Sequence, residues 1–502
     1  MNDMLITRRF FIGGAGSFAA LGPRALFAAK PGTFDKGLPE LTFGVLSDVH
    51  VCLAKGGGSL EKNYTTAHLE KAFAFFRDNG ADAVVIAGDM AHSGLVGEHR
   101  AVAEAWARVF PGDKAPDGRP VARVFVYGNH EWSSAGRAAA VFADEAERRA
   151  NYLSVDPKKH WADVFHEDWT PFFVKNVKGY DFVGCHWHVG GCCGKNEVFT
   201  QGMGAFYDSI KAKLDPKKPF FHIQHPHPKG TVHGENVWGQ DTGASTKTLS
   251  QFPNAISFSG HSHSTLVDAR AIWQGAFTSV GTASLRDLGG GCFASGVAQG
   301  YENWKSPSGP EAKAMDELKA MQLFNRFDAK QGQIVRVFKD RVVFSRRDFA
   351  NDLPLGEDWV MPLPAAESKP FAFDMREAKA VSPKFASGAA LRFATDKVAG
   401  RRPRKGAGKR PVVDVYIPPA LAEKSAIGVR YIVRAAGADG QPLEVAVLAD
   451  AYRFAPESQR VREPVKCRIF TERLAKGEVK FEVRAYSVWG RPSEPLKGRF
   501  RI

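Results

Sequence analysis

The chain has 502 residues, of which 44% are hydrophobic and 24% are charged, and its formal net charge is +14. This length is enough for two or more domains with separate cores, and the unbiased composition excludes a disordered or fibrous chain. A basic surface favours anionic partners, such as phosphorylated substrates, nucleic acid or membrane surfaces, without choosing among them.

The N-terminus has the pattern of a twin-arginine signal peptide. Arg8 and Arg9 open a moderately apolar stretch that ends near Leu21, and two small residues follow at Ala28-Ala29. The apolar part is shorter than the roughly 20 residues of a membrane span. We therefore expect a signal peptide at residues 1–29 and export by the twin-arginine route, to the periplasm or the cell surface. A basic tail followed by a buried helix is the alternative. No later stretch is apolar enough to span a membrane.

Six cysteines are present, and their spacing is not that of a small disulfide scaffold. They are Cys52, Cys185, Cys192, Cys193, Cys292 and Cys467. No C-x-x-C pair occurs, an oxidising compartment would permit disulfides, and the pairing stays open.

Residues 41–347 alternate between short apolar runs and helical patterns. Leu69, Phe73 and Phe76 share one face of a predicted helix, and Gly80 can cap its end. The apolar runs, most of which end at a glycine or a polar motif, are 41–46, 83–87, 121–126, 220–223 and 255–258. This is the pattern of an α/β fold, in which ligands collect at the loops beyond the strand ends. Residues 331–349 predict two further, antiparallel strands.

A different pattern begins after about Pro364. Short β-like runs, evenly spaced and separated by turn residues, lie at 412–417, 429–433, 444–448, 465–470 and 479–486. They predict an all-β sandwich of roughly 130 residues, and the ending FEVRAYSVWGRPSEPLKG resembles the last strands of a fibronectin type III domain. We therefore place an α/β domain at 38–364 and a β-sandwich at 370–502. The basic segment 397–410 is expected to be a solvated loop, with a docking patch for polyanions as the alternative.

Four short motifs with metal-binding side chains follow predicted strands in a fixed order. They are Asp48-Val49-His50, Gly88-Asp89, Gly128-Asn129-His130-Glu131 and Gly260-His261-Ser262-His263. Asp48 and His50 lie two residues apart, so an extended strand would point both side chains the same way, and His261 and His263 repeat this arrangement. Together the motifs supply the carboxylates and imidazoles that a two-metal hydrolase site needs.

In this order the motifs resemble those of the calcineurin-like metallophosphoesterase family, whose pattern is D-x-H, G-D, G-N-H-[DE], a histidine after a strand, and G-H-x-H. The resemblance covers about residues 41–347. It implies a four-layer α/β/β/α metallophosphoesterase sandwich, with its metals at the strand ends, and a phosphate ester of a small molecule as substrate. It also implies two divalent metal ions, whose identity among iron, manganese, zinc and nickel stays open.

The same resemblance implies a role for each motif residue. One ion would be held by Asp48, His50, Asp89 and His263, and the second by Asp89 as a bridge with Asn129, His225 and His261. His130 would contact the phosphate as the catalytic residue and could protonate the leaving oxygen. A hydroxide that bridges the metals would attack directly and in line.

The isolated histidine of the family pattern has three candidates in the segment KPFFHIQHPHPKG. His225 is preferred because it lies just past the apolar strand and before a proline. His222 lies inside the strand and faces the opposite way while the strand stays extended. His227 is a candidate for lining the pocket.

The second motif departs from the pattern of the protein-phosphatase branch, G-D-x-x-D-R-G. This chain has GDMAHSG, so that His92 replaces the acid that orients the G-N-H histidine, and Ser93 replaces the arginine. A neutral His92 could still accept a hydrogen bond, but a His–Asp dyad is in doubt and protein phosphatase activity is not expected. Glu131 is a candidate partner for an imidazole that binds metal.

Weaker signals have two interpretations each. The segment Cys185–Cys193 could hold a structural metal, although its spacing matches no zinc template, or it could line the pocket. Trp132 could stack on a nucleoside base or pack in the interior. Arg137 and Arg286 could bind phosphate or lie on the surface as ordinary cations.

The sequence therefore predicts an exported two-metal phosphoesterase that hydrolyses phosphate ester bonds. One alternative is a cyclic-nucleotide or nucleic-acid phosphodiesterase, which the basic segment and Trp132 mildly favour. The other is a non-catalytic surface-binding protein with a structural metal site. The full set of ligands argues against the second alternative, because a decaying site is expected to lose ligands.

Overall fold

A computed structural model describes residues 37–52, 59–132, 144–188, 202–234, 237, 239–288, 327–398, 408–421 and 427–502. Three expectations fall wholly or partly outside these residues. They concern the signal peptide at 1–29, most of the basic segment 397–410, and the residues Arg137, Cys192, Cys193 and Cys292. Within the described part, no helix has both the length and the apolar character needed to cross a membrane.

The first sheet of the α/β region has the strand order β12-β11-β10-β1-β2-β3, and β13 also pairs with β11. Its strands are β1 (Leu41–Leu46), β2 (Ala83–Ala87), β3 (Ala122–Val126), β10 (Gln331–Val337), β11 (Arg341–Asp348), β12 (Leu353–Pro354) and β13 (Trp359–Pro362). The strands β1, β2 and β3 are parallel, whereas β10 is antiparallel to both β1 and β11. The hairpin predicted at 331–349 therefore exists, and it extends the sheet beside β1.

The second sheet has the order β4-β5-β6-β7-β9-β8. Its strands are β4 (Phe172–Val177), β5 (Tyr180–Cys185), β6 (Phe220–Ile223), β7 (Ala255–Ser259), β8 (Ile272–Gln274) and β9 (Thr278–Gly281). The four strands β5, β6, β7 and β9 are parallel neighbours, and β4 and β8 run antiparallel at the two edges. Both sheets thus contain a block of parallel strands whose carboxyl ends can carry a site.

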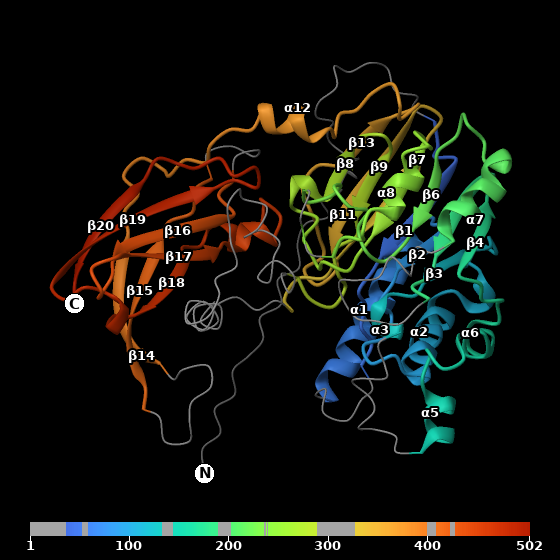
Figure 1. Cartoon of the computed structure of the whole chain (residues 1–502), viewed down its shortest axis with the longest axis horizontal. Coiled ribbons are helices and arrows are strands. Elements are labelled where there is room, and N and C mark those ends of the chain that lie inside the picture. The colour runs from blue at the N-terminus through green and yellow to red at the C-terminus, as the bar shows by residue number, and fades with distance from the viewer. Residues whose placement is uncertain are drawn as a thin grey trace, which may run out of the picture. The chain divides into compact units, whose positions relative to one another are not determined.

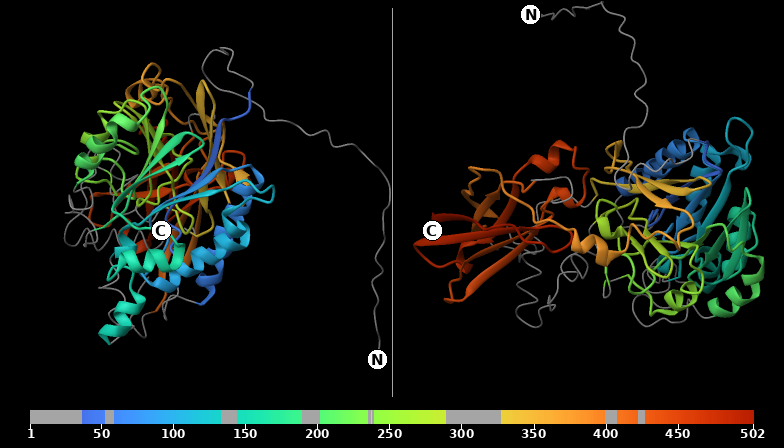
Figure 2. Two further views of the ribbon diagram at one scale, coloured as in Figure 1. Left: turned by 90° about the vertical axis from the view of Figure 1, so that its right-hand side faces the viewer. Right: turned by 90° about the horizontal axis from the view of Figure 1, so that it is seen from above.

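The two sheets pack face to face through a core of aromatic and branched side chains. The ring of Phe43 on β1 lies 4.7 Å from that of Phe221 on β6 and 5.7 Å from that of Phe258 on β7, centroid to centroid. The left view of Figure 2 shows blue and green helices on opposite outer sides of the sheets. The helices of the region are α1 (Ser59–Asp78), α2 (Val96–Val109), α3 (Asn129–Trp132), α5 (Glu145–Asn151), α6 (Pro157–Phe165), α7 (Met203–Ile210) and α8 (Ala244–Leu249). This is the expected four-layer α/β/β/α metallophosphoesterase sandwich (Figure 1).

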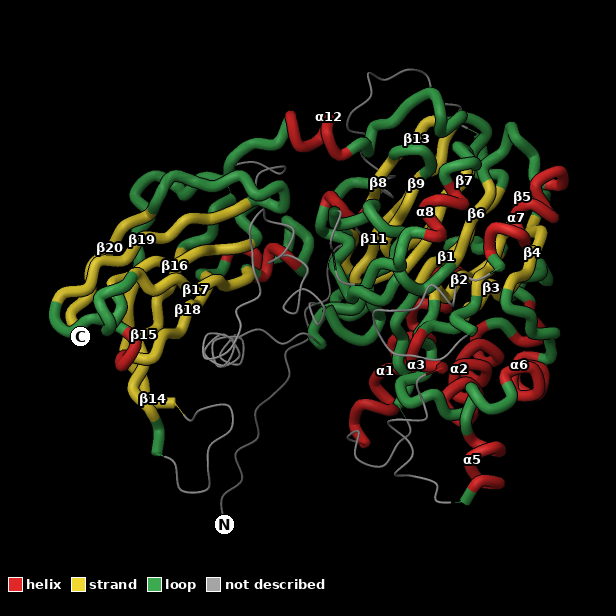
Figure 3. Tube along the Cα trace, viewed as in Figure 1, coloured by secondary structure: helices red, strands yellow, loops and turns green. Residues whose placement is uncertain are grey.

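The C-terminal region is all-β, as predicted, and its strands form two antiparallel sheets (Figure 3). One sheet has the order β14-β15-β18 and the other the order β17-β16-β19-β20. The strands are β14 (Arg392–Val398), β15 (Arg410–Ile417), β16 (Arg430–Ala436), β17 (Pro442–Leu448), β18 (Val465–Phe470), β19 (Glu478–Tyr486) and β20 (Leu496–Arg501), preceded by α12 (Phe373–Ala378). Every second residue of β19 is buried, including Val479, Phe481 and Val483, as in a strand with one face on a core.

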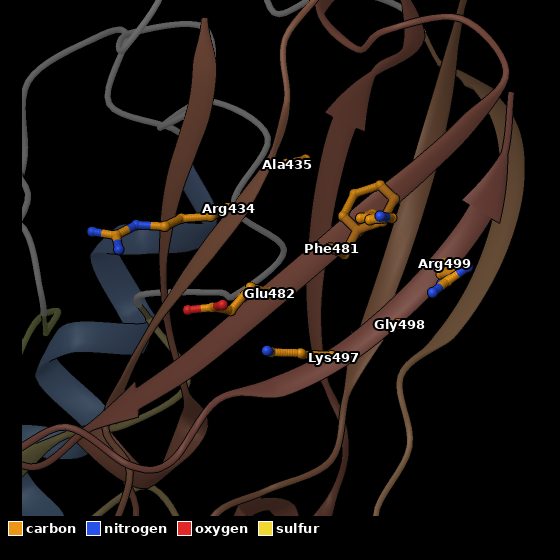
Figure 4. A pocket seen from close by; sticks show the side chains of 8 residues that line it. Arg434, Ala435, Phe481, Glu482, Lys497, Gly498 and Arg499 are labelled. Atoms are coloured by element: carbon orange, nitrogen blue, oxygen red, sulfur yellow. The ribbon is translucent and has the colours of Figure 1, made fainter.

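Figure 4 shows a hollow on the second of these sheets, whose lining residues include Arg434, Glu482, Lys497 and Arg499. Carboxylates partly neutralise the cations at its rim. Arg434 Nε lies 2.8 Å from Glu444 Oε2, and a guanidinium nitrogen of Arg499 lies 3.2 Å from a carboxylate oxygen of the neighbouring strand β19. None of the four sequence motifs lines this hollow.

Candidate metal centre

The motif residues lie directly beyond the carboxyl ends of parallel strands from both sheets. Strand β1 is followed by Asp48 and His50, β2 by Asp89, β3 by Asn129 and His130, β6 by His225, and β7 by His261 and His263. Because the parallel strands of the two packed sheets end on the same side, these residues converge although they are up to 215 positions apart. Sequence spacing alone could not fix this convergence.

The backbone at the site is unusual. Five of the seven predicted metal ligands have a positive φ, namely Asp48 (50°), His50 (49°), Asp89 (54°), His261 (69°) and His263 (51°). Residues other than glycine occupy this left-handed region at a cost, and such residues concentrate at functional sites. The chain holds these side chains in place through turns that a regular strand would not form.

A first group of ligand atoms comes from Asp48, His50 and His263, and these atoms all lie within 4.8 Å of one another. Asp48 Oδ1 is 3.1 Å from Nε2 of His263 and 3.7 Å from Nε2 of His50. The other carboxylate oxygen, Oδ2, accepts hydrogen bonds from the Ser47 hydroxyl (2.6 Å) and from the backbone N–H of His261 (3.0 Å). These two bonds fix the carboxylate so that Oδ1 points at the imidazoles.

A second group comes from Asp89, His225 and His261. Asp89 Oδ2 lies 3.1 Å from Nε2 of His225, and it is also 3.6 Å from Nε2 of His50 in the first group. Asp89 thus lies between the two groups, which is the position required of a bridging ligand. Asn129 is buried at the start of α3.

The donor atoms fit a pair of divalent cations. In the described part of the chain, Asp48 Oδ1, Asn129 Oδ1 and His225 Nε2 are buried and make no hydrogen bond. Buried polar atoms are nearly always satisfied, so the absence of partners at three of the predicted ligand atoms is the pattern that a cation would complete. Imidazole with carboxylate and amide oxygen suits iron, manganese, zinc and nickel.

The electrostatics of the site agree with this fit. Burial opposes protonation of His225, but the carboxylates of Asp89 and Asp48 outweigh it and raise its pKa to about 9. Burial also opposes a charge on Asp89, yet the neighbouring imidazoles, His225 foremost, hold the pKa of Asp89 well below its usual value. Burial lowers the pKa of His261 to about 3. The carboxylates therefore stay ionised and attract positive charge into a buried site.

Two metal-ligand histidines are oriented through their second ring nitrogen. Nδ1 of His225 lies 2.8 Å from the carbonyl oxygen of Ala87, and Nδ1 of His263 lies 2.9 Å from Asp287 Oδ1. Each contact places the proton on Nδ1 and leaves Nε2 facing the site, as is common for imidazoles that bind metals. The sequence analysis did not identify Asp287, because the preceding strand β9 has the sequence TSVG and is not an apolar run that marks a strand end.

His130 lies at the edge of the site and is held by two contacts. Its backbone N–H donates to Asp89 Oδ1 (2.9 Å), and Nδ1 lies 2.6 Å from the carbonyl oxygen of His92. The ring of His92 stacks on that of His130, with 5.3 Å between centroids and 26° between planes. The side chain of His92 therefore does not replace the acid of a dyad, because the main-chain carbonyl of His92 bonds His130 instead.

Glu131 has a different role from the one expected. Its carboxylate accepts hydrogen bonds from the backbone N–H groups of Gly128 (2.6 Å), Ala91 (2.7 Å) and Asp89 (3.2 Å). Of the imidazoles, the one beside it is that of His99, at 3.5 Å, which is not a predicted ligand. The expectation that Glu131 bonds a metal-binding imidazole is wrong, because the turns after β2 and β3 use its charge for their backbone amides.

The other two histidines of the 222–227 segment lie away from the ligand groups. His222 is buried between the Tyr207 hydroxyl (2.7 Å) and Gln224 Oε1 (2.8 Å). His227 is also buried, and its two ring nitrogens contact the hydroxyls of Ser259 (2.7 Å) and Ser262 (2.8 Å). His227 thus holds the loop that carries His261 and His263 in place.

The Cys185–Cys193 segment shows no metal site among its described residues, 185–188. Cys185 is buried, and burial raises the pKa of its thiol. Nδ1 of His186 accepts a hydrogen bond from the backbone N–H of Tyr127 (3.0 Å) inside an aromatic cluster. Trp132 packs, partly buried, against the hydrophobic core that the helices share with the sheets.

One family profile covers this region of the chain. Residues 41–265 match the profile of the family described as calcineurin-like phosphoesterase. No curated protein matches the chain. Among solved structures, a dimetal phosphatase from Danio rerio aligns over 64% of this chain and 99% of its own, with 13% identity and a TM-score of 0.35. A purple acid phosphatase from yellow lupin (Lupinus luteus) seeds aligns over 64% of this chain and 54% of its own, with 12% identity and a TM-score of 0.33.

The profile match covers all six residues that the fold gathers into the two ligand groups, together with the Gly128–Glu131 motif. Residues 41–265 therefore carry a calcineurin-like phosphoesterase domain, and its ligand groups are those of a metal-dependent hydrolase of phosphate esters.

Proposed function

We propose that this chain is an exported two-metal phosphoesterase that hydrolyses phosphate esters of small molecules. The observation that carries the proposal is the position of Asp89, whose Oδ2 lies 3.6 Å from His50 in one ligand group and 3.1 Å from His225 in the other. Two bound divalent ions would clamp the phosphoryl group and supply a hydroxide nucleophile near neutral pH.

His130 is the residue that would move the proton. The His92 carbonyl holds Nδ1, so Nε2 is the nitrogen that faces the site, 3.9 Å from Asp89 Oδ2. In the doubly protonated form, Nε2–H can donate to the leaving oxygen as the ester bond breaks. Asp89 Oδ1 fixes the His130 backbone, so the imidazole is positioned by the same residue that joins the two ligand groups.

The test uses two variants with separate readouts. Asp89→Asn should lose bound metal, measured by elemental analysis, together with turnover of p-nitrophenyl phosphate. His130→Ala should keep its metal and lose turnover by about 10²- to 10⁴-fold. If folded, metal-loaded wild-type protein hydrolysed no mono- or diester with any of the four metals, the proposal would be rejected. The relative rates on p-nitrophenyl phosphate and its bis-ester separate a monoesterase from a phosphodiesterase.

Export is supported by the Arg8-Arg9 pair and the apolar stretch that follows it. Replacing both arginines by lysine should leave the protein in the cytoplasmic fraction of a host with twin-arginine transport. An unchanged distribution between cell fractions would reject this route.

A fibronectin III-like identity for the C-terminal sandwich is supported by its described residues, which form seven strands divided three and four between antiparallel sheets. Residues 370–502 produced alone should then give an all-β circular dichroism spectrum and a cooperative unfolding transition. A disordered fragment would count against an independent domain.

A further inference from the structure

The positive charge of the chain is concentrated in its C-terminal region. Residues 370–502 contain 27 Lys and Arg against 14 Asp and Glu, a net charge of +13, whereas residues 1–369 contain 41 against 40. The region that carries the metal ligands is therefore nearly neutral. A charge that one region carries alone favours an anionic partner for that region.

The hollow of Figure 4 lies between two rows of charged side chains on the exposed face of its sheet. Lys497 of β20 lies opposite Glu482 of β19, and two residues along the strands Arg499 lies opposite Lys480. Between the rows the floor is main chain, because strand residues alternate between faces and the side chain of Phe481 is buried on the other side. The two rows are about 7 Å apart along the strands, which is two residues.

The hollow has an excess of positive charge that the sheet does not neutralise. Its charged lining consists of four cations and one carboxylate, namely Arg434, Lys480, Lys497, Arg499 and Glu482. Lys480 and Arg499 stand directly opposite each other, and like charges in this position destabilise a sheet. The exposed ammonium groups of Lys480 and Lys497 make no ion pair within the described part of the chain.

The two arginines of the hollow are paired, but only at the surface. The side chains of Arg434 and Glu444 are 53% and 45% exposed, and those of Arg499 and Glu478 are 65% and 57% exposed. Ion pairs this exposed contribute little to stability, because water and salt screen them. An anion in the hollow would therefore meet two unpaired ammonium groups and two guanidinium groups that exchange partners at little cost.

We propose that the hollow docks an acidic polysaccharide, a thin chain whose sulfate, phosphate or carboxylate groups lie between the two rows. The planar guanidinium forks of Arg434 and Arg499 match the oxygens of such groups, and the two lysines add point charges. This docking is separate from ester hydrolysis, because no metal ligand lines the hollow. It holds the protein on a polymer and leaves the metal centre to act on a second molecule.

The lining of the hollow favours a polysaccharide over two other kinds of polyanion. Single-stranded nucleic acid binds largely by stacking its bases on aromatic rings, but the one aromatic residue of the lining, Phe481, is buried. A nucleic-acid duplex is a stiff cylinder and a membrane is a plane, so neither enters a hollow this narrow. In the described part of residues 392–502 no large hydrophobic side chain is exposed, so none is available to insert into a bilayer.

The first experiment titrates the full chain with heparin, a sulfated polysaccharide, by calorimetry. Lys480→Gln/Lys497→Gln should weaken binding about 10-fold and lower its salt dependence, because two cations no longer displace counterions from the polymer. Lys379→Gln/Lys384→Gln is the matched control. It removes the same charge from two exposed lysines of the C-terminal region that do not line the hollow, and it should weaken binding by less than about 2-fold.

Three results of this titration would overturn the inference. They are an equal loss in both double variants, which would reflect net charge alone, unchanged binding in Lys480→Gln/Lys497→Gln, and no measurable binding of heparin to the wild type. Circular dichroism and urea unfolding verify that both variants keep the fold, as expected for exposed lysines.

A second experiment tests the class of the partner. Wild type and Lys480→Gln/Lys497→Gln are titrated at equal salt with duplex DNA, with a single-stranded oligonucleotide, and with vesicles of phosphatidylserine and phosphatidylcholine. The loss of affinity caused by the double substitution should be largest for heparin. A larger loss for either nucleic acid or for the vesicles would assign the hollow to that partner and overturn the inference.

Discussion

The carboxylate of Glu131 accepts a hydrogen bond of 2.7 Å from the backbone N–H of Ala91, which joins the turn after β3 to the turn after β2. The same carboxylate also accepts from the N–H groups of Gly128 and Asp89. One buried anion therefore connects two of the strand ends that position metal ligands, although Glu131 itself belongs to neither ligand group.

Glu131→Gln should destabilise the protein. The side-chain NH₂ group of glutamine would face backbone N–H groups that now donate to the carboxylate, and donors cannot bond one another. A hydrogen bond to a charged acceptor contributes about 1.5–3 kcal/mol, so we expect a loss of about 3 kcal/mol in the free energy of unfolding and weaker metal binding. Urea unfolding of the metal-free protein measures the first effect and calorimetry the second. A variant as stable as the wild type would show that the three amides do not need the charge.

Asp287→Asn should weaken metal binding about 10- to 100-fold, because the oriented imidazole of His263 loses its charged partner. Competition with a chelator measures the affinity. Asp352→Asn removes an acid that pairs with Lys71 and Arg347 at the surface, and it should leave metal affinity unchanged. Equal affinities in the two variants would contradict the assigned role of Asp287.

Gly88→Ala should abolish metal binding. A Cβ at position 88 would lie 2.4 Å from Nδ1 of His225, and Gly88 has a φ of 88°. Gly80→Ala is the matched control, since Gly80 has a φ of 75° but a Cβ added there would meet no atom within 4 Å. The control should lose about 1 kcal/mol of stability through backbone strain and keep its metal. Metal content of both variants distinguishes steric displacement of His225 from strain alone.

Because of His222, the free energy of unfolding should decrease as the pH falls below neutrality. Burial lowers its pKa from 6.5 to about 4, against the opposing bond to Gln224. Between these values the unfolded chain binds the proton and the folded chain does not, so the free energy of unfolding decreases as the pH falls from 6.5 to 4, by about 3 kcal/mol in total. His222→Gln should remove this contribution. Unfolding of both proteins by urea at several pH values tests it, and parallel profiles would refute it.

The sequence predicted those parts of the fold that are buried on both faces. Strands β1, β2, β6 and β7 are short, largely apolar runs, and in the structure all of their residues are buried. Strand β14 was not predicted, because it carries Arg, Asp and Lys side chains and is exposed at nearly every position. Its place is determined by pairing with β15 and by the ring of Phe393, which stacks on Phe500 of β20 at 5.3 Å.

At the site, the sequence indicated residue types but not contacts. The position just past the apolar strand and before a proline favoured His225 over His222, and the two side chains do face different partners. The partner of His130 could not be predicted in the same way, since a main-chain carbonyl leaves no trace in the residue type at position 92. The position of Arg286 beside Asp48 could not be predicted either. It depends on the order of strands in the second sheet, which brings the end of β9 beside that of β1.

The positive φ angles at Asp48, His50, Asp89, His261 and His263 also limit how the site can evolve. Left-handed backbone is least costly for glycine, asparagine and aspartate, and it is a severe outlier for valine, isoleucine or threonine. A saturation library at these five codons should therefore retain folded protein with Asn or Gly, even without metal, and lose it with β-branched residues. Drift at this centre would pass through inactive but folded intermediates, so a chain could lose its chemistry and keep its architecture.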